Sequence, residues 1–142
     1  MNDSTWTWIS GSDTIYHPGE FGDKGIPNTS YVPSSRNYAV GWYDSLRREL
    51  WVFGGAGYGA SGSNDGELML RIAPRKNYIL NSLIGYLNDL WRFRVNDSTW
   101  TWISGSNAIN QLGIYGVKGV PNINNVPGSR RDSVGWFDSV RQ

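Results

Sequence analysis

Residues 96–106 read NDSTWTWISGS, and the same eleven letters stand at 2–12. The offset of 94 positions continues without a gap, pairing 2–48 with 96–142, and 28 of these 47 pairs are identical. Such self-similarity is typical of chains built from copies of one structural unit. The 142 residues therefore hold one full unit and half of a second, and we expect them to be part of a longer repeat array.

Four segments of one unit have the composition of β-strands: 38–43, 50–53, 87–95 and 100–103. They are rich in aromatic and β-branched residues and are bounded by Gly, Asn, Asp and Ser, a pattern typical of strands joined by turns. Segment 50–53 is apolar at every position, so both of its faces need cover. We expect 36–104 to form a four-stranded antiparallel sheet between neighbouring sheets. The tryptophans expected in the packed core are Trp6, Trp8, Trp51, Trp91, Trp100 and Trp102.

This unit resembles the kelch repeat in three features. A double glycine, Gly54-Gly55, follows the second strand; Phe93 stands seven positions before Trp100; and Arg36 precedes the first strand, as does its copy Arg130. The resemblance implies an all-β, kelch-type β-propeller fragment, with one complete four-stranded antiparallel blade plus parts of the two adjacent blades. The central domain of galactose oxidase has a propeller of this kind. The resemblance implies structural roles for Arg36, Gly54, Gly55, Phe93, Trp100 and Arg130.

The same interpretation divides the chain into three parts. Residues 1–35 would hold the last strand of a preceding blade and a long top-face loop, 36–104 the complete blade, and 105–142 a second long loop and the first strand of the next blade. Segment 65–83 is either a true insertion or an artefact of gene prediction. Strands 6–9 and 132–138 would lack their own partners, so we expect self-association or loose packing unless 2–12 pairs with 130–138.

Composition excludes several classes of function. Thirteen Lys and Arg balance twelve Asp and Glu, so the net charge is too small to indicate binding of nucleic acid. The sequence has no cysteine and a single histidine, which excludes thiolate and multi-histidine metal sites. No apolar run is long enough to span a membrane. Residues 57–62 match a dinucleotide-binding glycine pattern, but no helix is indicated after them, so we expect no cofactor.

Extra chain length is concentrated in two connections, 56–86 and 105–130, and the earlier copy of the second is 11–36. In a blade whose strands run up and down in turn, these connections emerge on the same face. Long loops on a rigid scaffold are where binding usually resides. We expect no enzyme but a non-catalytic scaffold that binds a protein or carbohydrate ligand there and contacts further blades of the parent chain. The alternative is a fragment of a secreted galactose-oxidase-like enzyme or carbohydrate-binding protein whose active residues lie outside this span. The loop aromatics, which either contact ligand or pack within the loops, are Tyr16, Phe21, Tyr31, Tyr58 and Tyr115.

Overall fold

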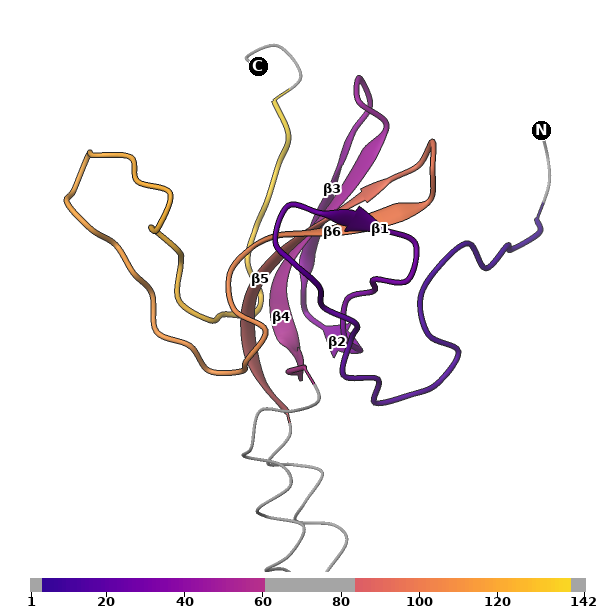
Figure 1. The fold of residues 1–142 in the computed structure, drawn as a ribbon, viewed down its shortest axis with the longest axis horizontal. Coiled ribbons are helices and arrows are strands. Elements are labelled where there is room, and N and C mark those ends of the chain that lie inside the picture. Colours follow the sequence, from indigo (N-terminus) through magenta and orange to yellow (C-terminus); the bar gives the residue numbers. More distant parts are fainter. Residues whose placement is uncertain (1–3, 61–83, 139–142) are drawn as a thin grey trace, which may run out of the picture.

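The computed structural model describes residues 4–60 and 84–138, which form an open antiparallel sheet of six strands (Figure 1). The strands are β1 (Pro27–Asn28), β2 (Arg36–Asn37), β3 (Val40–Asp44), β4 (Glu49–Tyr58), β5 (Ile84–Arg94) and β6 (Thr99–Ser104). These two ranges contain no helix, and hence no helix that could cross a membrane. The predicted all-β fold is confirmed.

The four long strands form a meander in which β3, β4, β5 and β6 pair in sequence order, each antiparallel to the next. The predicted strand order of 36–104 is therefore confirmed. Strand β4 runs further than predicted, because its glycine-rich end, 54–58, continues to pair with the start of β5. Strand β1 was not predicted: it comes from the first long loop and pairs with the outer edge of β6.

Strand alternation gives the sheet two different faces. On one face a cross-strand row joins Val52, Trp91 and Trp102, with Phe93 and Trp100 in the next row. Trp91 is fully buried there, because the ring of Phe21 from the first long loop lies 4.9 Å from its ring centre.

On the other face Trp42 and Trp51 stack with their ring planes 4° apart. The chain after Ser133 runs back along this face, where Gly135 lies against Val40 and Phe137 lines a small pocket with the two tryptophans. Each face of the sheet is thus partly covered by a different loop segment.

The double glycine marks a backbone crossing. Gly54 and Gly55 have φ values of 62° and 102°, in a region that side chains disfavour. The amide of Gly55 donates to the carbonyl of Arg130 at 2.9 Å, and the amide of Arg130 donates to the carbonyl of Leu87 at 2.9 Å. A Cβ on Gly54 would lie 2.9 Å from the Arg130 carbonyl oxygen, so the second repeat approaches the first where no side chain fits.

Strands are also expected at 6–9 and 132–138, near the two ends of the described chain. Residues 4–9 and 132–138 form no strand, and the alternative pairing of 2–12 with 130–138 is not formed by the residues described. Trp6 and Trp8 were expected in the core but are 99% and 67% exposed, because no neighbouring strand pairs with their segment. The proposed insertion at 65–83 lies outside the described residues.

Candidate functional site

The long connections meet at one end of the sheet. The amide of Ala60 donates to Asn107 and that of Asn110 to Tyr86, both at 2.7 Å, while the amide of Tyr58 donates to Ser35 at 3.4 Å. The short turns 45–48 and 95–98 lie at the opposite end (Figure 1). The strand order therefore brings the ends of the long connections to the same end of the sheet, which we call the loop end, as the alternation of strand direction predicts.

Carboxylates hold the turns at that opposite end. Asp44 accepts hydrogen bonds from the amides of Leu46 and Arg47 at 3.0 Å each, and from the Arg47 guanidinium at 2.8 Å. The Arg47 hydrogen bond lowers the pKa of Asp44. Asp97 plays the same part in the other turn, where the Thr99 hydroxyl donates at 2.7 Å and lowers the pKa of Asp97.

Two of the predicted ligand contacts, Tyr16 and Tyr58, lie together at the loop end. Their ring centres are 5.7 Å apart and the rings are tilted by 58°. Tyr16 is 53% exposed, whereas Tyr58 is 8% exposed. Burial, with a smaller contribution from Tyr16, raises the pKa of Tyr58, and its hydroxyl has no hydrogen-bond partner among the described residues. The exposed ring of Tyr16 thus packs on the buried ring of Tyr58.

A second aromatic group at the same end was missed from the sequence. The guanidinium of Arg131 lies 5.6 Å from the ring centre of Tyr38 and 5.4 Å from that of Tyr86. Both tyrosines are exposed, and Arg131 also pairs with Asp132 at 3.2 Å. The available signal was Tyr86, which directly precedes the expected strand 87–95, but no spacing in the sequence links it to Arg131.

The three other loop aromatics do not join these groups. Phe21 packs on the sheet against Trp91 and against Trp102, 5.2 Å away between ring centres. Tyr31 lies over Gly22 within its own loop, where a side chain at position 22 would overlap its ring. Tyr115 is 66% exposed on the second loop. The five predicted residues therefore do not form one site.

Arg36 lies in a network of polar contacts within the sheet. Its two terminal nitrogens each donate to one carboxylate oxygen of Asp89 at 2.7 Å, and its side chain also donates to the backbone carbonyls of Ser34 and Gly54 at 3.1 Å. Asp89 is fully buried and accepts a further bond of 2.7 Å from the indole of Trp91. These contacts fix the position of Arg36 in the sheet.

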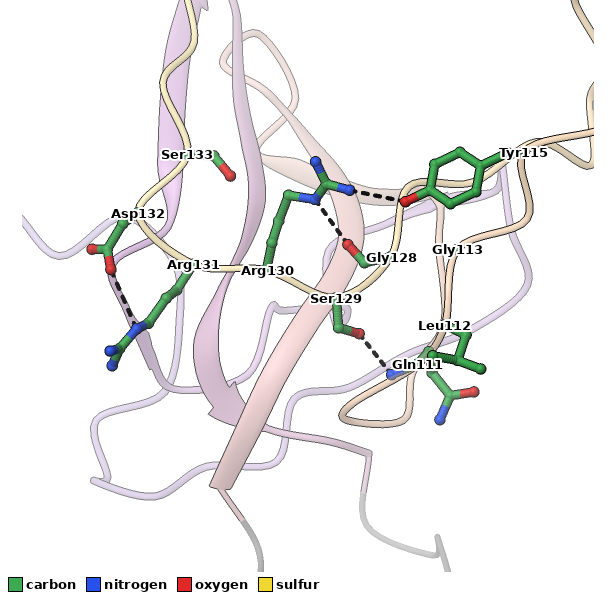
Figure 2. A pocket seen from close by; sticks show the side chains of 10 residues that line it. All are labelled: Gln111, Leu112, Gly113, Tyr115, Gly128, Ser129, Arg130, Arg131, Asp132 and Ser133. Carbon is green, nitrogen blue, oxygen red and sulfur yellow. Dashed lines mark hydrogen bonds and ion pairs between the residues drawn. The ribbon is translucent and has the colours of Figure 1, made fainter. Parts of the chain in front are cut away.

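Phe93 and Trp100 pack against each other with ring centres 5.0 Å apart. Arg130, the repeat copy of Arg36, is exposed instead and donates to Gly128 and to the hydroxyl of Tyr115 (Figure 2). Equivalent residues of the two copies thus occupy different environments.

A pocket of about 280 Å³ lies beside the stacked Trp42 and Trp51. Glu49 in its wall is buried, 3.5 Å from Arg92, and one of its carboxylate oxygens has no hydrogen-bond partner among the described residues. Within 4–60 and 84–138 no three acidic, histidine or cysteine side chains gather to hold a metal ion.

Comparison of the chain with protein-family models, with curated proteins and with solved structures gave no match.

Proposed function

We propose that this chain is a non-catalytic binding module, part of a kelch-type β-propeller in which 36–104 form one blade. The blade is supported by the four-stranded meander, by the packing of loop segments on both faces, and by the backbone crossing at Gly54-Gly55. In this proposal 1–35 and 105–142 belong to the junctions with the neighbouring blades.

In this proposal the ligand binds at the loop end of the sheet. The main observation in support is the Tyr16–Tyr58 pair. Tyr16 offers an exposed ring whose position is held by contact with the buried ring of Tyr58. Tyrosine combines an apolar body with a polar tip, and so suits a partner that presents both kinds of group. A protein surface and a carbohydrate both have this chemistry.

Binding of a protein or carbohydrate at this end can be tested directly. The purified chain is screened against a glycan array and a displayed peptide library, and the affinity of each selected ligand is measured for Tyr16→Ala. Because truncation of an aromatic anchor in an interface costs upwards of about 1 kcal/mol, we expect affinity to fall about fivefold or more.

The matched control is Tyr43→Ala at the turn end. Tyr43 has a similar exposed fraction, 46% against 53% for Tyr16, so the two changes remove similar surface. An equal or greater loss of affinity from Tyr43→Ala would refute the placement of the ligand at the loop end.

A further inference from the structure

The second long loop has the same internal geometry as the first, although its surroundings differ. In each copy an amide–carbonyl bond of 2.8 Å closes the loop, an isolated antiparallel bridge follows, and the arginine Nε donates to a carbonyl two residues earlier. The first copy uses Ser35–His17, Glu20–Val32 and Arg36–Ser34; the second uses Ser129–Gln111, Ile114–Val126 and Arg130–Gly128. The loop around Arg130 is therefore preformed in the shape that the loop around Arg36 takes.

In the first copy the loop packs against strand β5. Arg36 donates two hydrogen bonds of 2.7 Å to the carboxylate of Asp89, and Phe21 packs on Trp91, two positions further along β5. The arginine and the aromatic ring of one loop together bind an aspartate and a tryptophan of one strand. Only 7% of the Arg36 side chain stays exposed.

In the second copy the same two positions are open. Arg130 and Tyr115, the copies of Arg36 and Phe21, are both exposed and contact each other at 3.3 Å. They line a pocket of about 730 Å³ whose wall also carries Gly113 and Gly128 (Figure 2). Among the residues that the structure describes, no carboxylate pairs with Arg130, which leaves the guanidinium fork available to one.

We propose that the Arg130 pocket is a docking site for the sheet of a further copy of this repeat, which presents an aspartate to Arg130 and a tryptophan to Tyr115. The first copy fixes the chemistry of the occupant, because the equivalent residues hold Asp89 and Trp91 there. The inference rests on the repeat organisation of the proposed function but not on the ligand site at Tyr16.

The test extends the whole chain after Gln142 with a second copy of residues 49–104. Since position 142 corresponds to position 48, this addition continues the unit in register. Thermal unfolding is followed for the extended chain, for Arg130→Met, for an Asp→Asn change in the added copy of Asp89, and for both changes together. Arg130→Met is also measured in the chain of 142 residues.

In the extended chain we expect Arg130→Met to lower Tm by about 6–20 °C, since it breaks a buried ion pair in a protein of about 200 residues. In the unextended chain the same change should shift Tm by no more than about 2 °C, because it alters only an exposed side chain. The double variant should lose less than the sum of the two single changes. Equal shifts of Tm in the two chain lengths, or additive losses, would overturn the proposal.

Hydrogen exchange over 110–131 gives a second readout that does not depend on a resolved unfolding transition. We expect the extension to slow exchange of this segment about tenfold or more, and Arg130→Met to reverse the effect. Arg48→Met, the same chemical change at an exposed turn position, should leave the protection intact. Unchanged exchange on extension would overturn the proposal, whereas loss of ligand binding in Tyr16→Ala leaves both readouts unaffected.

Discussion

Removal of the Arg36 guanidinium is the most informative perturbation of the folded sheet. Arg36→Met deletes both 2.7 Å bonds to Asp89 and leaves a fully buried carboxylate, to which only the Trp91 indole still donates among the described side chains. Breaking a buried pair from one side costs about 3–5 kcal/mol, because the charge left behind is neither solvated nor paired. Against a typical net stability of about 5–15 kcal/mol, this loss takes a large share of the free energy of unfolding.

The assay is urea unfolding followed by tryptophan fluorescence, which reports the summed change in environment of the eight tryptophans, including the buried Trp91. The measurements cover Arg36→Met, Asp89→Leu and the two together. Because an apolar pair avoids the desolvation cost of two charges, the double variant should be more stable than Arg36→Met alone. The coupling free energy should reach about 1–3 kcal/mol. Additivity of the two changes to within about 0.5 kcal/mol would refute the account of a tightly coupled pair.

Three further predictions follow from the turns, the glycines and the exposed rings. Gly54→Ala should lower the free energy of unfolding by about 1–3 kcal/mol more than Gly25→Ala, which shares a left-handed backbone but has open space around it; equal losses in urea unfolding would contradict this. The hydrogen bond from Arg47 lowers the pKa of Asp44 from 3.8. The Asp44 carboxylate therefore stabilises the fold fully above pH 3.8, and this stabilisation is lost as pH falls through the lower pKa of the folded state. The difference in urea midpoint between the natural chain and Asp44→Asn should therefore shrink on acidification below about pH 4, and a constant difference would contradict it. Because Trp6 and Trp136 are 99% and 82% exposed, the sedimentation coefficient should rise with concentration; a concentration-independent monomer with a sharp melt would speak against self-association.

The meander could be predicted because its signals are local. Alternating threonine and tryptophan at 99–102 and the turn residues at 96–98 predict a strand and a reversal within a few positions. The ion pair within the sheet could not be predicted, since Arg36 and Asp89 are 53 positions apart and nothing in the sequence singles out that carboxylate. The grouping of Arg131 with Tyr38 and Tyr86 depends on tertiary packing in the same way.

The repeat itself separates what local sequence determines from what packing determines. The letters TWTWIS form β6 at 99–104, where β5 pairs along one edge, yet the identical letters at 5–10 form no strand. Trp102 is half-buried in the first setting, and its copy Trp8 is 67% exposed in the second. Strand propensity is thus insufficient without a partner to satisfy the backbone hydrogen bonds.

The long loops behave in the opposite way. Tyr16 and its copy Asn110 share a positive φ, 64° and 58°, and Tyr38 and its copy Asp132 do so at 54° and 56°. They do so although Phe21 of the first loop packs on the sheet and its copy Tyr115 is exposed. In the second copy the amides of Asn110 and Asp132 donate to the carbonyls of Tyr86 and Tyr38 in the first unit, while the Ser129–Gln111 and Ile114–Val126 bonds close the loop itself. The second loop therefore has this shape without an occupant at Arg130. A loop that is rigid in advance loses little conformational entropy when a sheet docks on it. The unit therefore joins a loop whose shape recurs in both copies to a segment, TWTWIS, that forms a strand in the copy where a neighbouring strand pairs with it and not in the other.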